Sequence, residues 1–463
     1  MTQPLLVGLD VGTTASKAVV FTPSGQPVAD GRAATPWQAT ASGAELDPRG
    51  LLDAALRAVG DALAAAPDGP VVALGVASIG ESGVLVDGAG EPVAPVIAWH
   101  DTRDEQQVRE LARDLGAAEF GVRTGLPLRG QWSLTKQRWL VRHWPATRTA
   151  TRRFSVAEWI VRALGGEEAS EQSLASRTGW LDLSARRWWP EALEWSGISP
   201  SLLPDLVASG DPLGRAGAAG VPPRLAGAVL TVAGQDHQAA SVGAGAAGPG
   251  DLLDSCGTAE ALIRTVPPGL PAAAVRQLVD AGITVGWHAL PGLWCLLGAT
   301  EGGLVLDRTL RLLGLTSAAI ADLDARALSA GPARLRLDIG RDAVTIADVG
   351  ADASPGALWR AATEAVTRQA AELLAVMTEV AGVHRRMVVT GGWARSSALL
   401  AAKSKSFGPM ARPRPGEAGA RGAALLAGLA AGVFASVDEL PAPEPALRTG
   451  QQPAPYTSEV SRV

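Results

Sequence analysis

The chain has 463 residues, of which 47% are hydrophobic and 19% charged, a composition typical of a folded globular protein and not of a disordered one. At about 150 residues per domain this length predicts three domains, and two large ones fit as well. Lys and Arg number 41 against 46 Asp and Glu, a net charge of −5, which disfavours nucleic acid as the main partner because phosphate binding needs a basic face. The two cysteines, Cys256 and Cys295, are too few for a disulfide framework or a metal knuckle.

The N-terminal residues 1–10 lack the basic and apolar regions of a signal peptide. The longest apolar stretch, Gly422–Val437, is short and rich in Gly and Ala, so it predicts a buried helix in preference to a membrane span. We therefore expect a soluble cytoplasmic protein without a membrane partner. Only four of the 41 basic residues are lysines, and we expect the last two, Lys403 and Lys405, to be solvated on a helix.

The first third of the chain alternates apolar runs with turn signals. Strands are expected at 5–10 and 17–21, separated by a Gly-Thr-Thr turn, and at the nearly continuous apolar runs 71–77 and 93–99. Apolar residues at helical spacing predict a helix over 51–65.

Residues 132–195 differ from the rest in holding eight of the 14 tryptophans among many arginines. These tryptophans are Trp132, Trp139, Trp144, Trp159, Trp180, Trp188, Trp189 and Trp195. Two interpretations are open: helix packing with cation–π stacking, which we favour, and a wall on which a sugar stacks.

A second unit is expected after the aperiodic Gly, Ala and Pro-rich segment 215–223. Its expected strands cover 229–233, 252–256, 282–287, 344–347 and 387–390, with a long helix over 358–380. The predicted domains are therefore 1–225, 226–440 and a loose tail at 441–463.

One short stretch of the first unit is echoed in the second. Leu9–Thr14 (LDVGTT) resembles Leu253–Thr258 (LDSCGT), and each places Gly-Thr at a hairpin turn after an apolar strand. The pattern suggests a duplicated α/β unit closing over a nucleotide, although so short a match also arises by chance.

The strongest local signal for chemistry is Asp10-Val-Gly-Thr-Thr14 followed by Lys17. Glycine lets the backbone approach a phosphate, successive N–H groups and Thr hydroxyls donate to phosphate oxygens, and a carboxylate before the turn can hold Mg²⁺ through water. An ordinary hairpin with a solvated lysine is the alternative. The chain has no GxxxxGK[ST] motif, so this is not a P-loop.

Three further glycine-containing segments lie near expected strand ends. Asp236, after the strand at 229–233, fits either a helix N-cap or a general base that takes a proton from an alcohol. Thr390–Ser396 opens a helix through Gly391-Gly392, which permits a flat ligand to lie on the backbone or merely close packing. The run Gly243–Gly248 matches GxGxxG but follows a helical stretch, which argues against a dinucleotide-binding turn.

In this order the motifs resemble those of the FGGY family of carbohydrate kinases, over residues 6 to about 433. The resemblance implies an α/β protein with the actin-like ATPase fold, two RNase H-like domains around a central cleft. It implies ATP-binding positions at Gly12, Thr13, Thr14, Lys17, Gly257, Thr258, Gly391, Gly392 and Ser396, a magnesium position at Asp10, and a catalytic Asp236. It implies substrate-binding positions at Glu81, Trp99, Asp101, Arg103, Gln131, Trp132 and His237.

The chain also departs from the family pattern. Gly80 replaces the Arg that glycerol kinase has beside the residue matching Glu81, and Gln131 replaces its Tyr. Trp393 stands at a small-residue position of the family's adenosine motif, which Gly391, Gly392 and Ser396 match. These departures leave the sugar open.

The activity that the resemblance implies is transfer of the γ-phosphate of ATP, with Mg²⁺, to a primary hydroxyl of a small ketose such as xylulose or of a polyol, with Asp236 as general base. The alternative is an actin-like nucleotide-binding protein that senses sugar without phosphorylating it, since fold alone does not give function. Homodimers are common in the family, and the sequence leaves the oligomeric state open.

Overall fold

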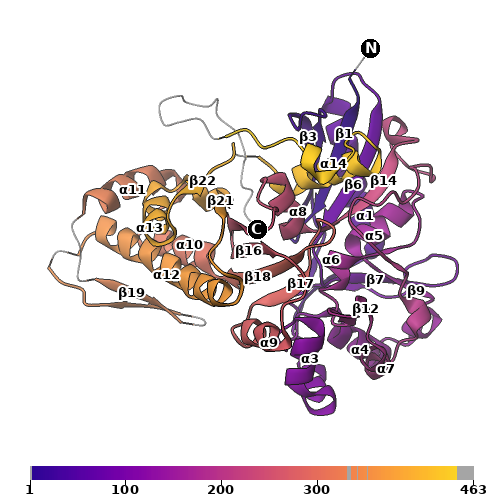
Figure 1. Cartoon of the computed structure of the whole chain (residues 1–463), viewed down its shortest axis with the longest axis horizontal. Helices are drawn as coiled ribbons and strands as arrows, with labels where there is room; N and C mark the ends of the chain where they lie inside the picture. Colours follow the sequence, from indigo (N-terminus) through magenta and orange to yellow (C-terminus); the bar gives the residue numbers. More distant parts are fainter. Residues whose placement is uncertain (1–2, 331–334, 341–342, 352, 415, 446–463) are drawn as a thin grey trace.

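The computed structural model describes residues 3–330, 335–340, 343–351, 353–414 and 416–445. Figure 1 shows two α/β units side by side, each built on one main sheet, as the sequence predicts. Among these residues, no helix combines the length and the apolar character needed to cross a membrane.

The first sheet has the strand order β14-β6-β1-β2-β3. Its strands are β1 (Leu5–Val11), β2 (Ala15–Phe21), β3 (Pro27–Ala34), β6 (Val71–Ser78) and β14 (Val229–Gln235). Strands β1, β2 and β3 are antiparallel, whereas β6 and β14 run parallel to β1. The continuous apolar runs of β1, β6 and β14 are explained by burial on both faces.

Helices cover both faces of this sheet. Helices α1 (Pro48–Ala65) and α5 (Val156–Ala163) lie over one face, and α8 (Asp236–Gly243) and α14 (Ala418–Ala430) over the other. Helix α1 begins where Asp47 accepts a hydrogen bond from the backbone of Arg49, with Pro48 in the first turn.

The second sheet has the order β17-β18-β16-β15-β21-β22. Its strands are β15 (Asp251–Cys256), β16 (Glu260–Val266), β17 (Thr284–Trp287), β18 (Trp294–Thr300), β21 (Arg386–Thr390) and β22 (Met410–Ala411). Its helices are α9 (Ala272–Asp280), α10 (Gly302–Leu312), α11 (Ile320–Ser329), α12 (Pro355–Ala381) and α13 (Ser397–Phe407). The antiparallel hairpin β15–β16 beside the parallel strand β21 repeats the arrangement of β1–β2 beside β6, so the two echoed segments hold equivalent places.

The remaining helices and short strands lie in segments that belong to neither of the two main sheets. Helices here are α2 (Glu105–Leu111), α3 (Ala117–Thr124), α4 (Ser133–His143), α6 (Gln172–Ala175) and α7 (Pro190–Ser196). Short strands are β4 (Gln38–Thr40), β5 (Gly43–Leu46), β7 (Gly83–Val86), β8 (Val96–Ile97), β9 (Arg152–Ser155), β10 (Ser170–Glu171), β11 (Leu181–Asp182), β12 (Arg187–Trp188), β13 (Leu206–Val207), β19 (Arg336–Ile339) and β20 (Val344–Ala347).

Three expectations about the elements need correction. The strand at 229–233, assigned to the second unit, is β14 and pairs with β6 of the first sheet, and α14 also packs on that sheet although it lies near the C-terminus (Figure 1). The run 93–99 forms only the two-residue strand β8, since Pro95 has no N–H to donate to a ladder. The helix expected over 422–437 ends at Ala430. Residues 446–463 of the expected tail lie outside the described residues.

The tryptophan-rich segment supports the packing interpretation. Guanidinium groups lie over the indoles of Trp132, Trp139, Trp180, Trp189 and Trp195 at 4.2–5.5 Å from the ring centroids. Trp132 and Trp180 are fully buried. These rings therefore stack on arginines within the fold.

The tight packing of α14 on β1 makes a testable prediction. A Cβ at Gly8 would overlap the carbonyl oxygen of Ala420, so Gly8→Ala should lower the free energy of unfolding by about 1–3 kcal/mol. The control is Gly60→Ala in α1, where an added Cβ meets no atom within 4 Å and should stabilise by about 0.5–1 kcal/mol. Denaturant unfolding of both variants measures the difference, and equal effects would contradict this view of the α14 contact.

Glu158 in α5 predicts a pH dependence of stability. It is buried, accepts hydrogen bonds from the backbone N–H groups of Ser155 and Glu171, and burial raises its pKa to about 7. A carboxyl whose folded pKa is raised contributes stability at low pH that is lost as the pH rises through the folded value. Between pH 6 and 8 the wild type should therefore lose about 1 kcal/mol more than Glu158→Gln. Unfolding free energies at the two pH values test this, and identical slopes would contradict it.

Candidate active site

The first predicted phosphate turn lies between β1 and β2 as a hairpin tip. Gly12 donates its N–H to the carbonyl oxygen of Ala15, and Thr13 and Thr14 stand at least partly exposed beside it. The indole Nε1 of Trp99 donates to Thr13 Oγ1 at 3.0 Å, so this predicted substrate residue contacts the turn. Thr35 and Trp37 donate to the carbonyl oxygens of Gly12 and Thr13, so the groups of the turn that suit an anion are the N–H groups and hydroxyls of Thr13 and Thr14.

Lys17 lies beside this turn and pairs with a residue that the sequence analysis missed. Its Nζ is 2.8 Å from Glu417 Oε2, and Glu417 immediately precedes α14. The pair is about one-third exposed, so an incoming phosphate can compete for the ammonium.

Asp10, at the end of β1, has the environment expected of a cation ligand. Its Oδ1 is buried and has no hydrogen-bond partner among the described residues. Burial, then the charge of Asp236, raises the pKa of Asp10 to about 7. An unpartnered carboxylate oxygen fits the one or two carboxylates that Mg²⁺ takes from a protein, so this residue fits a magnesium position.

Asp236 begins α8, directly after β14, and its carboxylate is anchored through one oxygen. Oδ1 accepts hydrogen bonds from His237 N at 2.7 Å and from Gln235 Nε2. The N-cap of α8 is Gln235, whose side chain accepts from Gln238 N. Asp236 is therefore not the N-cap residue, which was one of its two predicted roles. Burial raises the pKa of Asp236, which makes the carboxylate a stronger base.

Glu81 lies between Asp236 and the tryptophan-rich segment. Its Oε1 accepts from Arg177 Nε at 2.9 Å, Arg177 Nη2 at 2.5 Å and Gln131 Nε2 at 2.9 Å. Within the described chain, no hydrogen bond reaches Glu81 Oε2, so this oxygen is free to accept from a substrate hydroxyl. Arg177 Nη1 donates to Thr284 Oγ1 of β17, and the pair thereby joins the first unit to the second sheet.

Arg177 also fills the space left by Gly80. A Cβ at Gly80 would lie 2.9 Å from Arg177 Cγ. In this chain the arginine beside Glu81 thus comes from the segment that follows α6.

Several predicted substrate residues lie behind the surface. Asp101 is buried and pairs with Arg103, whose Nη1 also reaches Glu45. Trp132 is fully buried, and its Nε1 donates to the carbonyl oxygen of Pro127. These three side chains therefore have their partners within the protein, whereas Gln131 and His237 are partly exposed.

The second phosphate turn and the adenosine turn meet in the second unit. The tip Gly257–Ala259 joins β15 to β16, and Gly391, in a left-handed conformation at φ +92°, packs against the backbone of Cys256 so closely that a Cβ would overlap it. Gly391 and Gly392 are exposed, but Ser396 is fully buried, where its Oγ donates to Asp324 Oδ1 at 2.8 Å and caps α13. Ser396 therefore shapes the turn.

Comparisons with known proteins agree with this arrangement. The FGGY carbohydrate kinase N-terminal domain model matches residues 5–243, and the C-terminal domain model matches residues 332–431. The chain is 33% identical over 323 residues to a xylulose kinase of Streptomyces rubiginosus, covering 68% of this chain and 64% of that protein. It is 30% identical over 487 residues to a glycerol kinase of Bordetella parapertussis, covering 96% and 92%.

Solved structures show the same fold. A xylulose kinase from Rhodospirillum rubrum superposes with a TM-score of 0.87 at 24% identity, covering 97% of this chain and 94% of that one. Plasmodium falciparum glycerol kinase with ADP gives a TM-score of 0.86 at 17% identity, covering 96% and 93%. The expected actin-like ATPase fold is confirmed, and the chain belongs to the FGGY family of carbohydrate kinases.

Proposed function

We propose that this carbohydrate kinase transfers the γ-phosphate of ATP to a primary hydroxyl of a small ketose or polyol. The observation that carries the proposal is Asp236, a carboxylate that is anchored through Oδ1 and whose pKa is raised by burial. It follows β14, and Asp10 lies in β1; both strands pair with β6, where Gln235 is opposite Ser78 and Asp10 is opposite Ala77. Gly80 lies beside both Gln235 and Arg177, the partner of Glu81. Asp236 thus lies near groups suited to phosphate and near groups suited to hydroxyls.

Each residue has a role in the proposed reaction. Asp236 accepts the proton of the attacking hydroxyl, and Glu81 Oε2 orients the substrate by accepting from another hydroxyl. The N–H groups and hydroxyls of the two phosphate turns stabilise charge on the transferred group, as phosphoryl transfer depends mainly on positioning and electrostatics. When bound, Mg²⁺ supplies positive charge to the phosphates, and Asp10 would hold it.

The sugar is the open part of the proposal. Relatives named xylulose kinase and glycerol kinase make ketoses and polyols of three to six carbons the first candidates. Glu81 suits a polyol hydroxyl, and His237 beside Asp236 keeps ketoses such as xylulose or fuculose in the set.

A coupled ADP-release assay over xylulose, fuculose, glycerol, erythritol and related polyols, with Mg·ATP, tests the proposal. We expect one class to give turnover far above the sugar-free ATPase rate. The alternative, a sugar sensor with this fold, predicts nucleotide binding without sugar-dependent ADP release. Asp236 and Glu81 argue against it, because a sensor needs no base at the phosphate site.

A further inference from the structure

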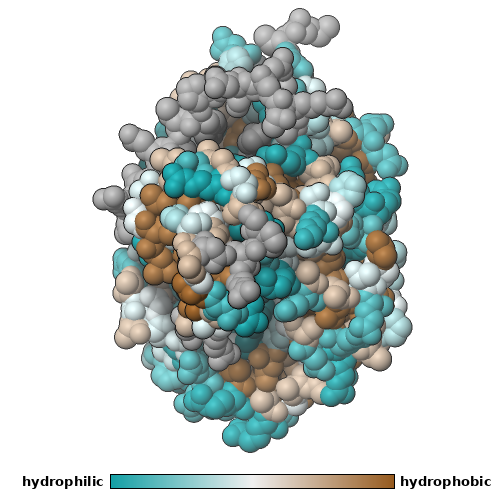
Figure 2. Space-filling model, turned by 90° about the vertical axis from the view of Figure 1, so that its left-hand side faces the viewer, coloured by the Kyte–Doolittle hydropathy of each residue, from teal (hydrophilic) through white to brown (hydrophobic). Residues whose placement is uncertain are grey.

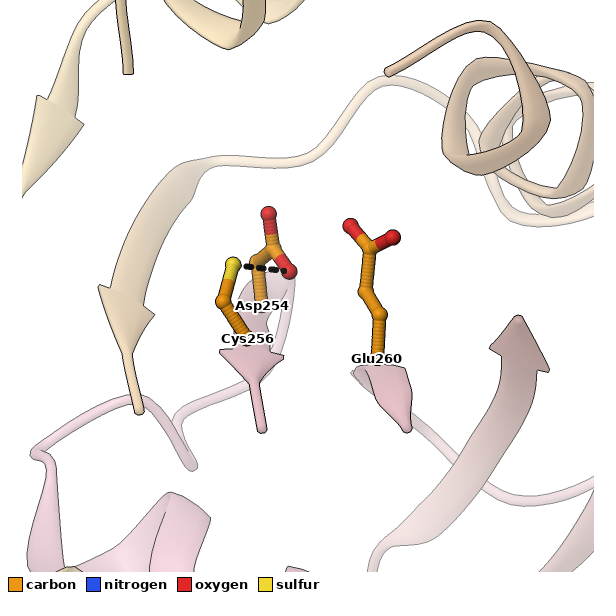
Figure 3. A group of neighbouring side chains, drawn as sticks. All are labelled: Asp254, Cys256 and Glu260. Carbon is orange, nitrogen blue, oxygen red and sulfur yellow. Dashed lines mark hydrogen bonds between the residues drawn. The ribbon is translucent and has the colours of Figure 1, made fainter. Parts of the chain in front are cut away.

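A buried ion cluster lies directly beneath the second phosphate turn. Lys403 of α13 is 0% exposed, and its Nζ lies 2.5 Å from Asp254 Oδ2 and also contacts Glu260 Oε1. Asp254 and Glu260 come from β15 and β16, and both carboxylates point to the same side of the sheet (Figure 3). The expectation that Lys403 is solvated was wrong, whereas Lys405, two residues on, is exposed.

This cluster is not a vacant metal site. Ligand atoms of Asp254, Cys256 and Glu260 lie within 4.8 Å of one another, as metal ligands do, but the Lys403 ammonium already lies between the two carboxylates. Burial alone would lower the pKa of Lys403, yet Asp254 and Glu260 outweigh it and raise that pKa. Burial, then Asp254, raises the pKa of Glu260 to about 7. The ammonium is therefore the permanent cation of this group.

The cluster ties together the segments that form the proposed nucleotide site. Asp254 and Glu260 flank the turn Gly257–Ala259. The two flanking carboxylates are buried, whereas the tip of the turn faces solvent. Lys403 belongs to the helix that the adenosine turn opens. One ammonium thus joins the phosphate turn to the adenosine helix.

The same cluster reaches the start of α10. Thr300 Oγ1 donates to Glu260 Oε2 at 2.9 Å and accepts from Gly302 N at 3.2 Å. At this helix start, a Cβ on Gly303 would overlap the carbonyl oxygen of Gly257. The phosphate turn, the adenosine turn and α10 therefore meet directly above the cluster.

We propose that Lys403 is a positioning residue for the nucleotide: through Asp254 and Glu260 it sets the second phosphate turn relative to the adenosine turn. This inference rests on the proposed function, because it takes these turns as the ATP-binding groups. A buried charge pair has a defined geometry, and small displacements of positioning groups weaken phosphoryl transfer strongly.

The test compares Lys403→Met with Lys405→Met, an exposed lysine of the same helix. We expect Lys403→Met to raise the KM for ATP by about 10-fold or more, with the KM for sugar changed less than about twofold, and Lys405→Met to change neither. A general loosening of the fold would move both KM values together and would overturn the proposal. So would a folded Lys403→Met protein with the ATP KM of the control.

A second variant covers the case in which Lys403→Met does not fold. Glu260→Gln leaves one ammonium opposite one carboxylate, so the remaining pair is neutral and only the ionic link to β16 is lost. It should also raise the ATP KM selectively, and an unchanged value would overturn the proposal. Calorimetric titration with Mg·ADP needs no sugar: weaker ADP binding in these variants supports the inference even if no sugar is phosphorylated, whereas binding equal to the Lys405→Met control opposes it.

Discussion

Asp236→Asn is expected to lower kcat by about 10²–10⁴-fold, because the amide cannot accept the proton of the attacking hydroxyl. The carboxylate is anchored by His237 N and Gln235 Nε2 through Oδ1, and an Asn oxygen can accept both bonds, so the geometry of α8 should persist. ATP binding should be kept or improved, since the variant removes a negative charge that raises the pKa of Asp10.

Steady-state kinetics with the best sugar from the panel, together with a nucleotide-binding titration, measure both effects. The control is Asp61→Asn, an exposed position on α1, which should leave both unchanged. If Asp236→Asn kept full turnover with any sugar, Asp236 would not be the general base. Loss of ATP binding together with turnover would instead point to a damaged fold.

Arg177→Met is expected to lower the free energy of unfolding strongly. The Arg177–Glu81 pair has only 6% of each side chain exposed, and the substitution leaves the Glu81 carboxylate buried without its cation. Breaking a buried ion pair by removing one partner costs about 3–5 kcal/mol. The KM for sugar should rise as well, because Glu81 loses two of the three donors that orient it and keeps only Gln131.

Denaturant unfolding and sugar kinetics test this prediction, with the exposed Arg187→Met of β12 as the control. The double variant Glu81→Gln/Arg177→Met should be less destabilised than Arg177→Met alone, since no unpaired charge then stays buried. A double variant as unstable as the sum of both single ones would mean that the pair is not coupled.

The outer face of the second unit carries exposed residues whose substitution should be tolerated. Figure 2 shows hydrophilic residues on this face, with hydrophobic ones in a band at the left and in smaller groups elsewhere. The exposed large hydrophobic residues include Leu312, Leu328, Ile346 and Val349. Substitutions to polar residues at such exposed positions should change stability little.

Local features were predicted well from the sequence. The two Gly-Thr turns lie at the tips of hairpins β1–β2 and β15–β16, because each follows a buried apolar strand and needs only contacts between neighbouring residues. The run Gly243–Gly248 ends helix α8 as expected and opens no dinucleotide-binding turn. These signals depend on backbone freedom and apolar periodicity within a few residues.

The sequence did not predict which distant strands pair or on which sheet the last helix packs. Strand β14 joins β6 across about 150 residues of chain, and α14 returns from the C-terminus to cover the first sheet. Parallel strands are joined by long crossover connections, so their pairing partners are distant in the sequence. An apolar run predicts that a strand is buried but not to which sheet it belongs. The domain boundary expected after residue 225 therefore separates two elements from the sheet on which they pack.

The sequence by itself determined the two-unit α/β architecture and the position of the two Gly-Thr turns at hairpin tips, since each leaves a local pattern. The roles of these turns and of Asp236 are predictions that the sequence also supplies. Only the tertiary structure decided which charges meet: Arg177 with Glu81, Lys17 with Glu417, and Lys403 with Asp254 and Glu260. The physical reason is that each partner is 96 to 400 positions away in the sequence, and only folding brings the two charges together. For the buried pairs the interior tolerates a charge only beside its partner. The scarcity of lysine marked Lys403 as worth attention, but only packing shows that it is buried.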